Sequence, residues 1–145
     1  MRYDEPQPRP DKAPNGERWP ATSAYVRGYA VLYTNGGSQL VIDNSHNNVD
    51  VFLKVVSVTD PEPKTVRSVF VLAHGQFNLN KLRTGTYEVR YHQLGSDTFL
   101  RSSTFALEES AIAGGTRYSI VTLALQMAAD ESAHAYALTA EEFER

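Results

Sequence analysis

The sequence contains no cysteine, and its 145 residues carry 14 basic and 17 acidic groups, a net charge of −3. The absence of cysteine excludes disulfide bonds, thiolate metal sites and cysteine nucleophiles. Because the charge is close to balanced, no broad basic surface is expected, and we predict no nucleic-acid partner. No apolar run reaches the roughly 18–20 residues that span a bilayer. Membrane attachment is therefore expected only through a segment outside this sequence, and the sequence leaves the compartment open.

Prolines are concentrated at one end, with five of the seven between residues 6 and 20. Proline fixes φ and biases the preceding residue towards extended backbone. We therefore predict that residues 1–20 form an extended, disordered linker or arm and that residues 21–145 form one domain. Such a linker is typical of a module carried by a larger protein. Trp19 is the one residue of this stretch expected to be anchored, either packed onto the domain as a plug or exposed for a partner.

From residue 24 onward, short apolar segments alternate with turn residues. Val, Ile, Thr, Tyr and Phe dominate these segments and suit a pleated surface. Gly, Asn, Asp and Pro between them favour turns. The predicted strands are Tyr25–Tyr33, Gln39–Asp43, Val49–Thr59, Val66–Ala73, Phe77–Leu82, Thr86–Leu94, Phe99–Leu107, Tyr118–Met127 and His134–Leu138.

The alternation of side chains favours strands over helices. Tyr87, Val89 and Tyr91 share one face, with polar residues between them, a period of two. Strands separated by about 8–12 residues with turns between them indicate a sandwich or barrel. We predict an all-β fold, an antiparallel β-sandwich of seven to nine strands. One helical turn is expected at residues 139–143, where Thr139 and Glu142 have the spacing of a capping box.

One stretch resembles a known fold family. It reads Ala73-His-Gly-Gln-Phe-Asn-Leu-Asn-Lys-Leu-Arg-Thr-Gly-Thr-Tyr-Glu-Val-Arg-Tyr91. The order Gly-x-Phe-x-Leu, a short gap, then Gly-x-Tyr-x-Val resembles the motif of carboxypeptidase-regulatory-like and transthyretin-like β-sandwich domains. Phe77 and Leu79 then point inward from one strand, Gly85 makes the bend, and Tyr87 and Val89 enter the core from the next. This fold serves many roles, so it implies no particular activity.

A second resemblance covers more of the chain. The segments Asn15-Gly-Glu-Arg-Trp-Pro20, Val41-Ile-Asp-Asn-Ser45, Asp50-Val-Phe-Leu-Lys54 and Tyr87-Glu-Val-Arg-Tyr91 are similar to an uncharacterised bacterial family. In that family the domain follows a linker, sometimes in membrane-anchored proteins. The resemblance implies a bacterial accessory domain presented by a larger protein.

The densest group of polar side chains lies at residues 43–50. The oxygens of Asp43, Asn44, Asn47 and Asp50 are of the type that binds Ca²⁺. Their spacing lacks the glycine and the twelfth-position carboxylate of an EF-hand loop. We therefore predict a hairpin whose Asn and Asp side chains bond nearby backbone N–H groups, with a calcium site as the weaker hypothesis.

Tyr25, Tyr29 and Tyr33 have the spacing of one strand face. They favour the core, and a carbohydrate-binding platform is the alternative. The four histidines lack metal-ligand spacing, and no nucleophile or phosphate-binding motif is present. We therefore predict no cofactor and no enzymatic activity.

These observations leave three functional hypotheses. The preferred one is a non-catalytic interaction module that binds a protein partner, or a second copy, through an edge or face of a sheet. The second is a module that binds carbohydrate or an envelope polymer through exposed tyrosines. The third is a structural assembly subunit whose arm, residues 1–20, reaches a neighbour.

Overall fold

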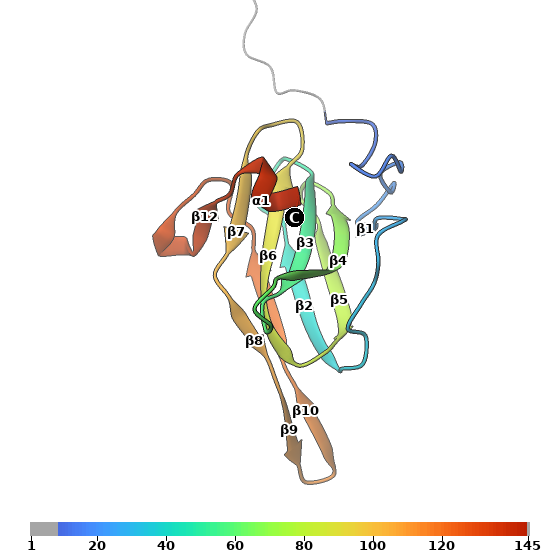
Figure 1. Ribbon diagram of the computed structural model, residues 1–145, viewed down its shortest axis with the longest axis vertical. Coiled ribbons are helices and arrows are strands. Elements are labelled where there is room, and N and C mark those ends of the chain that lie inside the picture. Colours follow the sequence, from blue (N-terminus) through green and yellow to red (C-terminus); the bar gives the residue numbers. More distant parts are fainter. Residues whose placement is uncertain (1–8, 145) are drawn as a thin grey trace, which may run out of the picture.

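The computed structural model describes residues 9–144, and its fold is all-β with one short helix (Figure 1). Residues 1–8 of the predicted linker lie outside the described residues. The elements are β1 (Ala24–Tyr25), β2 (Ser38–Asp43), β3 (Val51–Ser57), β4 (Lys64–Val71), β5 (Gln76–Leu82), β6 (Gly85–Gln93), β7 (Phe99–Ser102), β8 (Phe105–Leu107), β9 (Glu109–Ile112), β10 (Gly115–Tyr118), β11 (Ile120–Ala124), a 3-10 turn (Glu131–Ala133), β12 (Ala135–Ala137) and α1 (Ala140–Glu144). None of the described helices is long and apolar enough to cross a membrane.

The larger sheet has seven strands in the order β1-β4-β3-β6-β7-β12, with β8 also paired to β6. All its pairs are antiparallel. Its central strand β3 is buried along its whole length, on both faces. Strands buried on both faces read as continuous apolar runs, which is why the segment around β3 shows little alternation in the sequence.

The smaller sheet has three strands in the order β11-β2-β5. The pair β2–β5 is antiparallel as predicted, but β11 runs parallel to β2. Side chains from both sheets meet in one hydrophobic core, which contains Leu40 and Leu79 of the smaller sheet and Leu53 and Val89 of the larger. The two sheets therefore form two layers over a shared core, consistent with a β-sandwich.

The opposite face of the larger sheet is covered by both ends of the described chain. Trp19 stacks on Phe70 at 5.3 Å between ring centroids, and Phe143 of α1 meets Phe52 at 5.8 Å. In α1 the Thr139 hydroxyl accepts from the Glu142 N–H while the Glu142 carboxylate accepts from the Thr139 N–H, so the predicted capping box is confirmed.

Residues 9–20 differ from the predicted free linker. Ala13 and Trp19 are buried, and the Trp19 indole donates a hydrogen bond of 2.8 Å to the Pro10 carbonyl. Trp19 is thus packed as a plug, and the described domain begins before residue 21. The Trp19 ring covers the apolar rings of Phe52 and Phe70 on this face of the sheet, and their burial favours the packed arrangement.

The strand predicted at Tyr25–Tyr33 is wrong beyond its first residue. The chain leaves β1 at Tyr25 and follows an irregular path to β2. Gly28 has φ +90° and Tyr33 has φ 55°, left-handed backbone that cannot continue a strand. The alternation of tyrosines therefore does not reflect a shared face.

A second departure is the hairpin β9–β10, which projects from the body of the molecule (Figure 1). Every residue of both strands is exposed. The hairpin connects β8 of the larger sheet to β11 of the smaller, so the chain changes layer there. Gly114, at φ +84°, lies in the turn of this hairpin, between β9 and β10.

Candidate functional site

The predicted calcium residues lie at the end of β2 and in its connection to β3, and their polar atoms hold this connection together. The Asn44 amide donates to Val49 O at 2.9 Å and Leu72 O at 3.0 Å. The Asn47 amide donates to Asn44 Oδ1 at 2.8 Å and to Leu125 O at 2.9 Å. These contacts tie the two sheets together where the chain crosses between them.

The two acidic members of this group also bind backbone. Asp50 Oδ1 accepts from the Ala73 N–H at 2.8 Å, and Asp43 Oδ1 accepts from Ser45 N–H at 2.9 Å. Hydrogen bonds from Ser45, first from its side chain, lower the pKa of Asp43. The predicted bonds to nearby backbone are present, but the connection is a crossover between sheets, not a hairpin. Within residues 9–144 no cluster of three or more acidic or histidine side chains is arranged to hold a metal.

The residues predicted for partner or carbohydrate binding are not brought together. Trp19 is buried against Phe52 and Phe70. Tyr25 packs edge-on against Phe77, Tyr29 against Phe52, and Tyr33 lies under the Arg83 guanidinium at 3.5 Å. Each tyrosine contacts a different neighbour, so the three rings do not form one platform.

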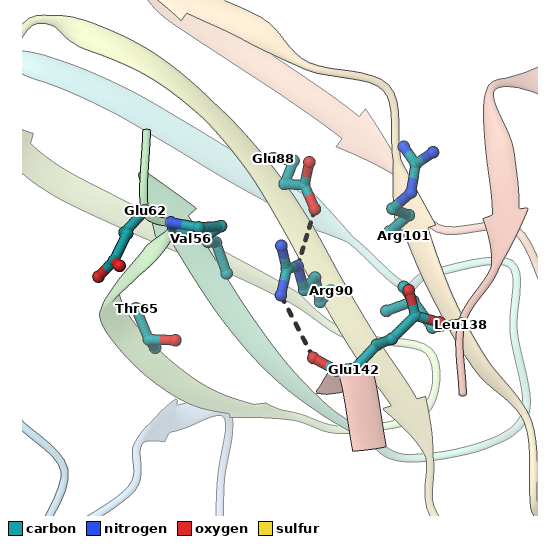
Figure 2. A pocket seen from close by; sticks show the side chains of 9 residues that line it. Val56, Glu62, Thr65, Glu88, Arg90, Arg101, Leu138 and Glu142 are labelled. Carbon is teal, nitrogen blue, oxygen red and sulfur yellow. Dashed lines mark hydrogen bonds and ion pairs between the residues drawn. The ribbon is translucent and has the colours of Figure 1, made fainter. Parts of the chain in front are cut away.

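A groove of about 510 Å³ lies on the outer face of the larger sheet, beside α1 (Figure 2). At its centre Arg90 Nε contacts Glu88 Oε2 at 2.7 Å, and Arg90 Nη1 donates to Glu142 O at 3.3 Å. Glu62 and Arg101 stand on its other sides. The groove mixes carboxylates with guanidinium groups, so its charge selects no single class of ligand.

The cations next to this groove hold the C-terminal helix. Lys54 Nζ donates to Phe143 O at 2.6 Å and lies 4.4 Å from the centre of the Phe143 ring. Burial lowers the pKa of Lys54, with the charge of Glu144 acting in the opposite direction. Lysine and arginine on the last carbonyls of a helix are a common way to satisfy them. The arrangement therefore accounts for the docking of α1.

The edges of the two sheets differ in how they are protected. The larger sheet ends in β1, two residues long, and in β12, three residues long. The smaller sheet ends in β5, which carries Lys81, and in β11, which carries no charge. From residue 118 to residue 129 no charged side chain occurs. Short length and lysine are devices that prevent edge pairing, and β11 has neither.

The hydrogen bonds of β11 identify its free side. Gln39 N–H donates to Ser119 O and Leu125 N–H to Asp43 O, so odd-numbered residues of this segment bond to β2. Because N–H and C=O of one residue point to the same side of a strand, the backbone groups of Ile120, Thr122 and Ala124 point away from β2. Among the described strands, β11 has β2 as its one neighbour.

An apolar cleft of about 260 Å³ lies beside this free edge. Its floor includes Val89, Tyr91 and Leu125, which belong to the main core. On its rim Ser103 Oγ lies 3.1 Å from His134 Nδ1 and 3.3 Å from the Tyr136 hydroxyl. The described hydrogen bonds give His134 no carboxylate partner, so this contact lacks the third member that orients a catalytic histidine.

Tyr91 crosses from the larger sheet to the end of β11 and leads to a testable pH dependence. Its hydroxyl donates to Gln126 O at 2.8 Å and accepts from Gln126 N–H at 3.2 Å. Burial raises the pKa of Tyr91 to about 12. The unfolded chain releases this proton near pH 10. The stability that Tyr91 contributes is therefore fully present below pH 10 and is lost as the pH rises towards 12, up to about 2.7 kcal/mol.

We expect Tyr91→Phe to lower the free energy of unfolding at pH 8 by about 1–3 kcal/mol, because the half-buried backbone N–H and C=O of Gln126 lose their partner. Urea unfolding at pH 8 and pH 11 should show a smaller alkaline loss in Tyr91→Phe than in the wild type. Lys54 has the opposite effect on stability. Its pKa is lowered from 10.5 in the folded protein, so the unfolded chain keeps the proton to a higher pH than the folded protein does, and the free energy of unfolding rises as the pH approaches 10.5. The control Tyr118→Phe, on the exposed hairpin, should follow the wild type. An equal alkaline loss in Tyr91→Phe and wild type would refute the assignment.

Sequence reasoning missed the free edge of β11 and the cleft beside it. The one available signal was the run without charge at residues 118–129, a pattern that a strand at the centre of a sheet also shows. Comparisons with protein-family models, curated proteins and solved structures found no match for this chain.

Proposed function

We propose that this protein is a non-catalytic interaction module that binds a protein partner by adding a strand of that partner to the free edge of β11. The observation that supports the proposal is the combination of an uncharged edge strand with outward-pointing backbone groups at Ile120, Thr122 and Ala124. In strand addition, main-chain hydrogen bonds supply affinity and alternate side chains supply specificity.

We also propose that the fold is of the transthyretin-like or carboxypeptidase-regulatory-like type and that the chain comes from an uncharacterised bacterial family. The support is the motif at residues 75–89. Leu79, Tyr87 and Val89 of this motif are fully buried, and Phe77 packs against the same core. The alternatives have less support. Tyr25, Tyr29 and Tyr33 contact different neighbours, and within residues 9–20 Ala13 and Trp19 are buried against their own domain.

Site-specific photocrosslinking in the cells that produce the protein tests this proposal. With benzoylphenylalanine in place of Ile120, which is 67% exposed, we expect a covalent adduct with another protein. The matched control is the same probe in place of Ile112, which is 44% exposed on the hairpin. Thr122→Pro should abolish the adduct, because it removes an outward N–H and leaves the bonds to β2 in place. Equal labelling at both positions, or none at position 120, would contradict the proposal.

A further inference from the structure

The cleft beside β11 is walled on two sides, which limits what can occupy it. One wall is β11 and the residues after it, up to Gln126. The other is formed by the β7–β8 segment around Ser103 and by Ala133–Ala135, which lead into β12. Figure 1 shows β12 and the turn before it extending sideways from the body. The larger sheet thus overhangs the free edge of the smaller one.

The interior of the cleft is neutral. Its lining includes no Asp, Glu, Lys or Arg, and its titratable side chains are Tyr91 and His134. A charged side chain placed there would lose its hydration without gaining an opposite charge. An apolar side chain would instead join the main core, against Val89, Phe105 and Leu123.

The geometry of a strand added to β11 determines which of its side chains enter the cleft. Side chains alternate between the two faces of a sheet. In β11, Val121 and Leu123 pack towards the core, while Ile120, Thr122 and Ala124 are exposed. Every second side chain of an added strand would therefore point between the sheets, into the cleft, and the others would point to solvent.

A second folded copy fits this site poorly. Antiparallel pairing of β11 with its own copy requires a twofold axis perpendicular to the sheet. Both larger sheets then lie on the same side of the paired edges, and the two overhangs of β7 and β12 meet in one space. A single extended segment has no such overhang.

We infer that the occupant of the β11 cleft is one extended segment of a partner whose alternate side chains are apolar and uncharged, and not a second copy of this domain; this inference rests on the proposed function of β11. Its backbone pairs with Ile120, Thr122 and Ala124. Its inward side chains, of the size of Val or Leu, fill the 260 Å³ cleft. The cleft thus requires an alternating apolar pattern, and the edge requires an extended backbone without proline.

The test uses the full chain and three synthetic peptides with a fluorescent label. The first is acetyl-Thr-Leu-Thr-Val-Thr-Leu-Thr-Lys-amide, in which apolar residues alternate. The second has the same composition with its apolar residues adjacent, and the third has Asp in place of both Leu. By fluorescence anisotropy we expect the alternating peptide to bind at least tenfold more tightly than either control. Equal binding of the three peptides, or none, would overturn the inference.

Two variants locate the binding. Ser103→Phe places a ring at the rim of the cleft, and we expect it to weaken binding of the alternating peptide at least tenfold. Ser110→Phe on the exposed hairpin is the matched control and should bind as the wild type does. Thermal unfolding of both variants checks that they fold. If Ser103→Phe misfolds, Thr122→Pro gives the same test from the edge side. Binding unaffected in a folded Ser103→Phe protein would place the peptide elsewhere.

Light scattering of the protein alone tests the remaining alternative, in which a second copy of the chain occupies the edge of β11. A dimer that Thr122→Pro converts to monomer would show that a second copy occupies the edge and would overturn the inference. A crosslinked partner at position 120 without preference for the alternating peptide would leave the proposed function standing and remove the inference. A lack of any crosslink at position 120 would remove the proposed function itself.

Discussion

Arg67→Ala is expected to lower the free energy of unfolding by about 3–5 kcal/mol, the range for removal of a large buried side chain. Arg67 is 1% exposed and lies on β4, opposite Val55 of β3. Val55 and Val69 face the core between the sheets, and Arg67 is two residues from Val69 on the same strand. Its side chain therefore lies between the layers, where its loss leaves a cavity.

The guanidinium of Arg67 also binds three carbonyls that converge from other parts of the chain. Nη2 donates to Tyr33 O at 3.3 Å and to Lys81 O at 3.5 Å, and Nη1 donates to Asn80 O at 3.4 Å. Tyr33 and Lys81 both have left-handed backbone, with φ of 55° and 56°. Arg67 thus connects β4 to the end of β5 and to the irregular segment before β2. Burial lowers the pKa of Arg67, so the cation is held here against a desolvation cost.

Two further variants separate packing from hydrogen bonding at this position. Arg67→Met keeps most of the volume but removes the donors, and we expect it to recover about half of the loss seen in Arg67→Ala. Arg117→Ala on the exposed hairpin removes the same charge without burial and should change stability by less than about 0.5 kcal/mol. Urea unfolding of the three proteins gives these values. An Arg67→Ala protein within 1 kcal/mol of the wild type would contradict the structural role.

The sequence predicts those parts of the fold in which the local residue pattern matches the environment of the same residues in the folded protein. Tyr87, Val89 and Tyr91 alternate with polar residues in the sequence, and all three are buried in β6. The Thr139–Glu142 spacing predicted the start of α1 because a capping box involves only residues in one turn. Such features need no knowledge of which strand lies next to which.

The parts that sequence missed depend on contacts between distant residues. Nothing near Arg67 indicates that three carbonyls will meet it, because those carbonyls come from residues 33, 80 and 81. An apolar strand such as β11 reads the same at an edge as at the centre of a sheet, because pairing on its second side is set by the rest of the chain. The candidate site lies at such a place, whereas Tyr25, Tyr29 and Tyr33, considered for carbohydrate binding from their spacing, contact different neighbours.

Trp19→Ala is expected to be the second large loss, about 3–5 kcal/mol in the free energy of unfolding. The centre of the indole ring lies 5.3 Å from the ring centres of both Phe52 and Phe70, and the Arg9 guanidinium lies 5.0 Å from the centre of the Phe70 ring. Removing the ring exposes the outer face of the larger sheet at these phenylalanines. The bond from the indole N–H to Pro10 O is lost as well, so residues 10–18 lose their anchor.

Thermal unfolding by circular dichroism should show a fall in Tm on the order of 10 °C for Trp19→Ala. Trp19→Phe keeps a ring on the sheet but cannot donate to Pro10, so we expect a loss of about 1–2 kcal/mol for that variant. Hydrogen exchange gives an independent measure, because the amides of Ala13 and Gly16, which donate to Glu17 O and Ala13 O, should lose protection in Trp19→Ala while those of β3 keep theirs. Unchanged stability together with unchanged protection at these amides would contradict the role of Trp19 as the anchor of residues 10–18.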